Sequence, residues 1–338
     1  MSRHIEDASC FALLVPTYQG TPFLRRLLEF LKAERYLGQI VLSDNSSGEH
    51  GDFVASCPEL YPELWLEVQA YEPGIGFLDK LTRTLTRLDA RFVMLCGQDD
   101  YIAPEGVEKL LQALQADPGL SCMRGRVARF HLRPIEREGA ARAAALELNK
   151  HPMLAYEDPR PLDRVLAHMR AYTSTLYSVH RREQLVESFR ATDAATRNVV
   201  FWQYLSSCIT VALGRVGCLD ELFLARQVHG RSWSASLQGD KEHWPLLLTS
   251  PSYSAYYSEF CHALAKFLSH RLGCGDALAL AARIDEAFVP LVTRAFCRTS
   301  HSDAGNDAFF GRLQTAGSAE NARVNTMARF ALPHAETY

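Results

Sequence analysis

The sequence predicts an α/β fold, with a mostly parallel, Rossmann-like sheet, flanking helices and a C-terminal helical subdomain. Apolar strand-like runs alternate with amphipathic helical segments in the first half, a pattern typical of parallel strands joined by right-handed crossovers. After residue 245, two long stripes of apolar residues at helical spacing take over. The chain has 338 residues, 47% of them hydrophobic, and can bury at least one sizeable core.

The first expected elements are a buried strand and a helix. The strand covers residues 11–15 and is broken by the turn 16–20. Thr21 supplies a helix N-cap and Pro22 fits the first turn, and the helix ends near Gly38. Its buried face is predicted from four leucines at helical spacing: Leu24, Leu27, Leu28 and Leu31.

Two further strands are expected to end at the same edge of the sheet. A strand over 39–43 is followed by the short polar residues 44–48, which suit a loop that touches a ligand. A helix begins after residues 74–76 and leads into a strand that starts at Val93. Its apolar stripe is Leu78, Leu81, Leu85 and Leu88.

The strand from Val93 ends abruptly in two adjacent carboxylates, Asp99 and Asp100. Ligands of open α/β sheets bind at the carboxyl ends of strands, and hard cations such as Mg²⁺ or Mn²⁺ prefer carboxylate and phosphate oxygens. The pair therefore indicates a cation site that holds a phosphorylated ligand. The alternative is an ordinary helix-capping turn, since Pro104 opens the next helix.

Three motifs, in this order and spacing, resemble the nucleotide-binding half of a GT-A glycosyltransferase of the family 2 type. They are Val15-Pro16-Thr17-Tyr18, Val41-Leu42-Ser43-Asp44-Asn45-Ser46 and Leu95-Cys96-Gly97-Gln98-Asp99-Asp100. The chain is most similar to a bacterial family-2-like subgroup with a lysine in the third helix and a Val-His-Arg stretch after a later strand. The resemblance covers about residues 10–235 and is strongest over the first 125.

The resemblance implies a site for a nucleotide-diphosphate sugar, with UDP favoured. The loop after the first strand would lie against the base and ribose, and Asp44 would accept a hydrogen bond from a uracil-type base. Lys80 corresponds to a basic position near the diphosphate, and its alternative interpretation is a solvated helix lysine. The implied donor-binding residues are Pro16, Thr17, Tyr18, Asp44, Asn45, Lys80, Asp99 and Arg226.

A divalent cation, Mn²⁺ or Mg²⁺, is also implied by the resemblance. Asp99 matches the metal-binding carboxylate of the family's Asp-x-Asp motif, with Asp100 beside it, while Gly97 occupies the position of the first aspartate. His229 matches a late histidine that reaches the metal or diphosphate. Arg226 and Arg231 either pair with phosphate or lie on the surface.

The catalytic base is the largest departure from the family. Gln203 stands where a Glu or Asp is expected to remove the proton of the acceptor hydroxyl, and an amide cannot do this at neutral pH. Asp193, in a stretch expected to be a loop, is the nearest replacement. A shifted alignment, a base from elsewhere or a catalytically weak protein are the alternatives.

The second half is expected to form the acceptor side. Residues 172–181 are predicted as a strand that lines the acceptor or is simply part of the sheet. Residues 198–213 are predicted as a buried helix rather than a membrane span. The Ala/Arg/Glu-rich run 137–148 suits a surface helix or a mobile loop.

Composition excludes several classes of protein. A net charge of −3 argues against nucleic acid as a general partner, and nine cysteines without C-x-x-C spacing argue against a zinc site or a disulfide framework. No secretory signal or transmembrane run is evident, so a cytoplasmic location is expected, with peripheral membrane contact left open.

Four regions are expected. Residues 1–130 form the nucleotide-sugar half, 131–240 the acceptor half, 241–300 a helical subdomain, and 301–338 a polar, poorly ordered tail. The helical subdomain either packs on the core or forms a homo-oligomer contact.

The resemblance implies that the protein transfers a sugar from the nucleotide donor, with inversion at the sugar carbon, to a glycan, lipid-linked or protein acceptor. A nucleotidyltransferase would need a Gly- and Lys-rich loop after the first strand, which 16–20 lacks, whereas a non-catalytic nucleotide-sugar binder remains the rival.

Overall fold

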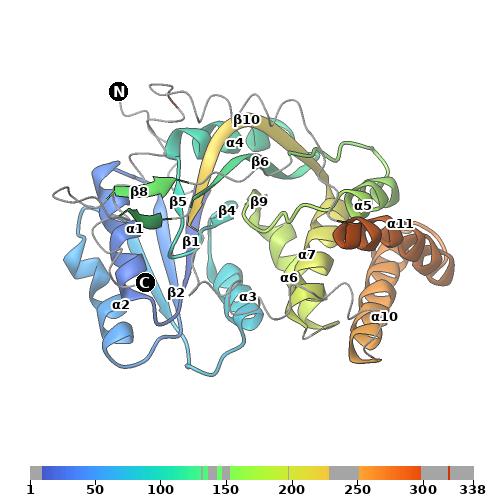
Figure 1. Ribbon diagram of the computed structural model, residues 1–338, viewed down its shortest axis with the longest axis horizontal. Coiled ribbons are helices and arrows are strands. Elements are labelled where there is room, and N and C mark those ends of the chain that lie inside the picture. The colour runs from blue at the N-terminus through green and yellow to red at the C-terminus, as the bar shows by residue number, and fades with distance from the viewer. Residues whose placement is uncertain are drawn as a thin grey trace.

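The computed structural model describes residues 10–130, 132–135, 143–146, 153–196, 198–227, 251–297 and 319. At its centre lies an eight-stranded sheet (Figure 1). Its strands are β1 (Phe11–Thr17), β2 (Gln39–Asp44), β3 (Leu66–Ala70), β4 (Phe92–Leu95), β5 (Tyr101–Ile102), β6 (Leu120–Phe130), β9 (Val179–Arg181) and β10 (Arg215–Gln227). Their spatial order is β3-β2-β1-β4-β9-β6-β10-β5.

The direction of these strands decides which ends meet at one edge. Strands β3, β2, β1 and β4 are mutually parallel. The short strand β9 is antiparallel to both β4 and β6, so β6 runs in the same direction as β4, and β10 is parallel to β6. The carboxyl ends of β2, β1, β4, β6 and β10 therefore lie along the same edge, where α/β sheets bind ligands.

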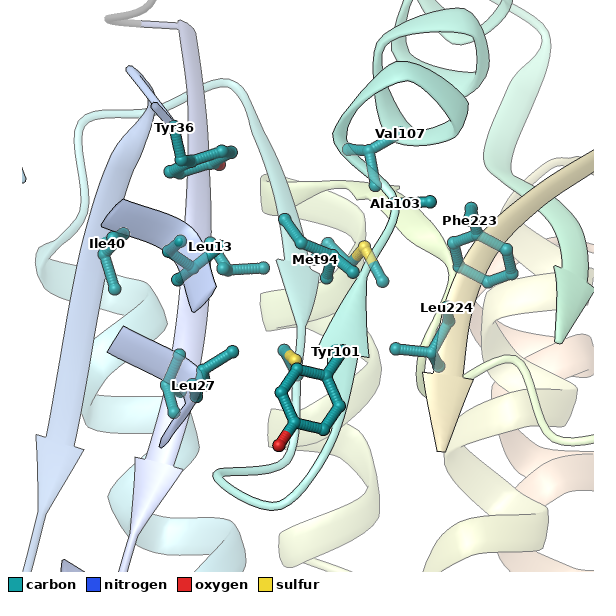
Figure 2. Packing of buried hydrophobic residues seen from close by; sticks show 14 of the residues in the cluster. Leu13, Leu27, Tyr36, Ile40, Met94, Tyr101, Ala103, Val107, Phe223 and Leu224 are labelled. Atoms are coloured by element: carbon teal, nitrogen blue, oxygen red, sulfur yellow. The ribbon is translucent and has the colours of Figure 1, made fainter. Parts of the chain in front are cut away.

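Helices cover both faces of the sheet, as the flanking helices of the prediction require. They are α1 (Thr21–Ala33), α2 (Glu49–Leu60), α3 (Phe77–Arg87), α4 (Pro104–Ala116), α5 (Pro161–Arg170), α6 (Arg182–Asp193) and α7 (Val199–Leu213). Alternate residues of β1 enter different cores: Leu13 packs with α1, α2 and α4, whereas Leu14 packs with α3 and α6. Figure 2 shows Leu13 and Leu27 in the first of these cores, with Tyr101 from strand β5.

The C-terminal helices pack on the core rather than standing apart. They are α10 (Pro251–Lys266), the π-helical turn η3 (Phe267–Arg271) and α11 (Ala277–Cys297). Phe260 and Phe288 share a buried cluster with Phe201 of α7 and Val165 of α5. In Figure 1 these helices lie beside α5 and α7, at the far end from α1 and α2. None of the described helices combines the length and hydropathy that a membrane crossing requires.

Several local predictions hold, because the apolar periodicity was strong. The four leucines of α1 are buried, Pro104 opens α4, and Asn198 caps α7 by accepting hydrogen bonds from the amides of Val200 and Phe201. Thr21, expected as the cap of α1, is its first residue instead, and the N-cap is Gly20. The last turn of α1 ends at Ala33 rather than near Gly38.

Two predicted segments are wrong. The strand expected over 172–181 is formed only by Val179–Arg181, because only these residues pair with β4 and β6. The segment 137–148 was expected as a helix or loop, but Ala143–Leu146 forms strand β8, antiparallel to β7 (Leu132–Ile135). The expected polar tail from residue 301 lies outside the described residues except for one position.

The Val-His-Arg stretch has a structural role. His180 is buried, and its Nε2 lies 2.7 Å from the carbonyl oxygen of Thr175. Arg181 donates hydrogen bonds to the carbonyl oxygens of Leu114, Asp117 and Leu120, which lie at and beyond the end of α4. A cation at this end of a helix stabilises its unpaired carbonyl groups. This stretch therefore fastens β9 to α4.

Candidate active site

The carboxyl ends of β1 and β2 are joined through one carboxylate. Thr17 lies opposite Asp44 in the parallel ladder, and both are buried. The hydroxyl groups of Thr17 and Ser46 each donate to Asp44 Oδ1, both at 2.7 Å. Among the described residues no donor contacts Asp44 Oδ2. One oxygen of this carboxylate is thus fixed by the protein while the other keeps its acceptor capacity.

Lys80 joins α3 to the same two strands. Its ammonium group donates to the carbonyl oxygen of Thr17 at 2.9 Å and to Asn45 Oδ1 at 2.6 Å. Only 1% of the residue is exposed, so the interpretation as a solvated helix lysine is wrong. Burial lowers the pKa of Lys80 to about 8, although the carboxylate of Asp44 opposes this. The Lys80 side chain thus holds the carboxyl ends of β1 and β2 together.

A second connection runs from the turn after β1 to the turn after β4. Gln98 accepts from the backbone amide of Tyr18 at 3.4 Å and donates to its carbonyl oxygen at 3.2 Å. The ring of Tyr18 remains exposed, at 56%. Gln19, with φ of 47°, donates its amide to Ser46 Oγ, which ties the turn to the end of β2. These contacts gather the turns after β1, β2 and β4 into one surface.

Asp99 and Asp100 occupy different environments. Asp100 is buried: its Oδ2 lies 3.3 Å from Nε of Arg226, and its Oδ1 accepts from the amide of Gln227 at 3.1 Å. Burial raises the pKa of Asp100, and Arg226 opposes this rise. Asp99 is only half-buried. Asp100 therefore fastens the end of β10 to the turn, and Asp99 is the more accessible carboxylate.

Arg226 is held on two sides. Besides its bond to Asp100, the guanidinium lies 4.2 Å from the ring centre of Tyr177 and donates to the Tyr177 hydroxyl at 3.3 Å. The residue comes from the end of β10, whereas Tyr177 lies in the turn that leads into β9. Arg226 thus lies beside Asp100 at this edge of the sheet and is not a fully exposed surface residue. Its part in donor binding stays a prediction.

Steric contacts explain why glycine occupies position 97. A Cβ atom there would lie 2.6 Å from Asp99 Oδ1 and 2.9 Å from Asp100 Oδ2. Both distances are below 3.0 Å, so a side chain at position 97 would require the carboxylate groups of Asp99 and Asp100 to move. Asp99 is half-buried and can turn away, whereas Asp100 is held by Arg226 and Gln227. The family's first aspartate could not be accommodated here without moving its neighbours.

The carboxylates fit a cation only in part. In the described portion of the chain, no three His, Cys, Asp or Glu side chains lie together as a ligand set. Asp99 offers the oxygen chemistry that Mg²⁺ and Mn²⁺ prefer, while Asp100 already receives two hydrogen bonds. His229, the third expected ligand, lies outside the described residues, as does Arg231.

The two candidate base positions lie on neighbouring helices. Asp193 is the last residue of α6, not part of a loop, and is half-buried. Gln203 is half-buried in the first turns of α7, and its backbone oxygen accepts from the Tyr172 hydroxyl at 3.4 Å. The neighbouring Trp202 packs edge-on against Phe77, with ring centres 5.9 Å apart. The start of α7 therefore lies next to the start of α3.

Several site residues escaped the sequence analysis. Ser46 and Gln98 were present in the quoted motifs but received no role, and Tyr177 was only part of a presumed strand. A signal existed for Gln98, because it lies directly before Asp99 at the end of a strand. None existed for the pairing of Tyr177 with Arg226, which are 49 residues apart.

Comparison with known proteins gives one sequence relative. No protein-family model matches the chain. An uncharacterized glycosyltransferase, YwdF of Bacillus subtilis, is 26% identical over 104 residues, or 31% of this chain. A segment of about a third of the chain is thus similar to part of a glycosyltransferase. The match covers 38% of YwdF, so it extends over well under half of that glycosyltransferase.

Solved structures with a similar course of the chain include complexes with nucleotide sugars. S. aureus TarS 1–349 with UDP-GlcNAc has a TM-score of 0.46 at 15% identity, covering 95% of this chain and 89% of that one. GalNAc-T7 with UDP, GalNAc and Mn²⁺ has 0.48 at 13%, covering 82% and 54%. The mannosyltransferase PcManGT from Pyrobaculum calidifontis, with GDP-Man and Mn²⁺, has 0.41 at 15%, covering 96% and 85%. At these TM-scores the likeness carries no weight for function, which has to be argued from the site.

Proposed function

We propose that the protein is a glycosyltransferase that moves a sugar from a nucleotide-diphosphate donor, with UDP favoured, to a glycan, lipid-linked or protein acceptor. The observation that carries this proposal is the state of Asp44. Thr17 and Ser46 fix one of its oxygens, and the other has no donor among the described residues. A carboxylate oxygen held in this way suits the imide N–H of a uracil base.

The rest of the donor would extend along the edge of the sheet. The exposed ring of Tyr18 offers a flat apolar surface for the base. Pro16 near the end of β1 and Asn45 directly after β2 would form part of the same donor surface. Asp99 follows at the end of β4, which is where the diphosphate is expected. Lys80 supports this surface through Thr17 and Asn45, so its role is to position the strand ends rather than to contact phosphate.

A divalent cation, Mn²⁺ or Mg²⁺, is part of the proposal. Asp99 would hold it, with Asp100 as neighbour and His229 as a further ligand. When bound, such a cation stabilises the negative charge that develops on the departing diphosphate. We expect transfer with inversion by direct displacement, with the protein in the cytoplasm or at the membrane surface.

Proton removal from the acceptor hydroxyl requires a general base. Asp193 is the candidate base, since Gln203 cannot accept a proton at neutral pH. The amide at position 203 also favours a second candidate function, a non-catalytic nucleotide-sugar-binding or assembly subunit. Slow hydrolysis of the donor distinguishes the two functions, because a protein that only binds the donor would release no free sugar.

The test is a thermal-shift panel of UDP, GDP, CDP, TDP and ADP, with and without Mn²⁺. A ligand that binds only the folded state stabilises it by about 2.7 kcal/mol at a hundred times its Kd. We expect UDP to give the largest shift, to depend on the metal, and to lose its effect in Asp99→Ala. Asp89→Ala, which removes an exposed carboxylate before β4, is the matched control and should respond like the wild type.

Two results would contradict the proposal. Either no nucleotide stabilises the wild-type protein, or Asp99→Ala responds as the wild type does. In the second case Asp99 and Asp100 form only a capping turn, and the likeness to glycosyltransferases is limited to the fold. If the donor-site result is positive, release of sugar from a UDP-sugar in wild type and Asp193→Asn examines the base.

A further inference from the structure

Two arginines lie side by side at the site edge. Arg129 of β6 and Arg226 of β10 are register partners in a parallel pair of strands. Partners in adjacent strands project to the same face and lie about 5 Å apart at their Cα atoms. Like charges placed directly opposite each other destabilise a sheet unless a counter-charge is present.

Only one of the two arginines forms a direct ion pair, although the charge of Asp100 also acts on Arg129 from further away. Arg226 is paired with Asp100 and lies against the Tyr177 ring. Arg129 is half-buried, and within the described portion of the chain its guanidinium has no hydrogen bond or ion pair. Burial lowers the pKa of Arg129, and the positive charge of Arg226 lowers it further. Its charge is thus partly desolvated beside a second positive charge.

The place of Arg129 along the edge indicates which part of a ligand it would meet. From β2 through β1 to β4, the edge carries Asp44, Thr17 and Asp99, the positions proposed for the base and the diphosphate. Strand β6 lies two strands beyond β4, with β9 between them. A donor laid out in this order has its diphosphate at β4, so its sugar and the acceptor point towards β6.

We propose that Arg129 binds an anionic group, phosphate or carboxylate, that lies beyond the donor diphosphate, on the acceptor or on the transferred sugar. The inference rests on the proposed function, because it uses the donor's direction along the edge. Asp100 is one negative charge beside two arginines, so an oxyanion at this place would supply a second charge and the direct partner that Arg129 lacks among the described residues. A guanidinium binds such groups through two parallel hydrogen bonds. The substrate class is therefore acidic: a phosphorylated or carboxylate-bearing acceptor, or a uronic acid donor.

The experiment compares wild type with Arg129→Gln, Arg129→Lys and a control, Arg126→Gln. Arg126 lies on the same strand but already pairs with Asp220 at 2.7 Å. Binding of inorganic phosphate to the UDP-loaded protein is measured by calorimetry, with Mg²⁺ because Mn²⁺ precipitates with phosphate. Chloride keeps the ionic strength constant, so that screening does not imitate competition. A second arm compares UDP-glucuronic acid with UDP-glucose.

If the acceptor carries the anion, phosphate binds to the UDP-loaded wild type. Its affinity for Arg129→Gln is at least about fivefold lower, and its affinity for Arg126→Gln equals that of the wild type. Arg129→Lys is expected to lie between them, because it keeps the charge and loses the paired hydrogen bonds. If the sugar carries the anion, the wild type prefers UDP-glucuronic acid over UDP-glucose, and Arg129→Gln abolishes the preference.

Two outcomes overturn the inference. In one, Arg129→Gln changes neither the affinity for phosphate nor the preference between the two UDP-sugars. In the other, Arg129→Gln weakens the binding of UDP but not that of UMP, which would assign Arg129 to the donor's terminal phosphate. Failure of the proposed function would look different, because no nucleotide would bind the wild type. The phosphate titration without nucleotide would still test whether Arg129 binds an anion.

Discussion

The ammonium nitrogen of Lys80 lies 2.6 Å from Asn45 Oδ1 and 2.9 Å from the carbonyl oxygen of Thr17. A helix is thereby fastened to the carboxyl ends of two strands through a single buried charge. Asp44, the carboxylate proposed to bind the base, is the register partner of Thr17 and directly precedes Asn45 in the chain. The shape of the donor surface thus depends on a residue that the donor need not touch.

Replacing Lys80 by methionine should destabilise the protein. The buried oxygens of Thr17 and Asn45 would each lose a charged donor, at a cost of about 1–3 kcal/mol in the free energy of unfolding. UDP-induced stabilisation should fall as well. Urea unfolding measures the first effect, with Lys109→Met as control, because Lys109 forms an exposed pair with Glu221. Equal stability of Lys80→Met and wild type would refute the supporting role.

Stability should also rise with pH because of Lys80. Burial lowers its pKa from 10.5 to about 8. Between these values the unfolded chain binds more protons than the folded one, so the free energy of unfolding increases with pH across this window. The cost of burying the charged amine is present in full below pH 8, where it offsets part of the loss expected for Lys80→Met. The difference between wild type and Lys80→Met should therefore grow from pH 8 to 10.5, and parallel pH profiles would contradict this account.

Acid should weaken the fold through His168. The ring lies edge-on to Tyr156 and Tyr172, and neither nitrogen has a hydrogen-bond partner among the described residues. Burial, with Arg124 nearby, lowers its pKa from 6.5 to about 3. The unfolded chain therefore binds an extra proton between these values, and stability falls as pH drops below about 6.5. His168→Phe should reduce this slope by one proton, as measured by denaturant unfolding at a series of pH values. An unchanged slope would exclude the ring as its source.

Asp44→Asn should reduce affinity for UDP while leaving the fold intact. An asparagine keeps an acceptor for Thr17 and Ser46 but turns a donor towards the imide N–H of the base. Two opposed donors should weaken binding about tenfold to a hundredfold. Calorimetric titration with UDP measures this, with Asp52→Asn on the exposed side of α2 as control. Unchanged UDP affinity would remove Asp44 from the proposed base contact.

Gly97→Asp restores the missing carboxylate of the family motif and should nevertheless destabilise the chain. Its Cβ would collide with Asp99 and Asp100, and Asp100 is held by Arg226 and Gln227. A cost of about 1–3 kcal/mol is expected, and Gly97→Ala isolates its steric part. Thermal unfolding in the presence of Mn²⁺ should recover stability for Gly97→Asp more than for Gly97→Ala. Wild-type stability of both variants would show that the turn can rearrange freely.

The sequence analysis succeeded where the local pattern was strong and failed where it was weak. The leucines of α1 and the aromatic stripes of α10 and α11 repeat at helical spacing, so their helices were found. Helix α2 received no prediction, since only Val54 and Cys57 of its residues are buried and Pro58 lies within it. Residues 172–178 have strand-forming side chains but no neighbouring strand to pair with.

By itself, the sequence determined the elements with strong periodicity, the motifs at the strand ends and the resemblance to GT-A glycosyltransferases. These features depend on residues close together in the chain. Only the tertiary structure decided that Lys80 is buried, that Asp100 pairs with Arg226, and that Arg129 lies beside Arg226 with no direct ion pair among the described residues. Each of these depends on strand order and register between segments up to 126 residues apart. Local side-chain patterns do not specify such long-range geometry, because it is fixed when the whole sheet packs against its helices.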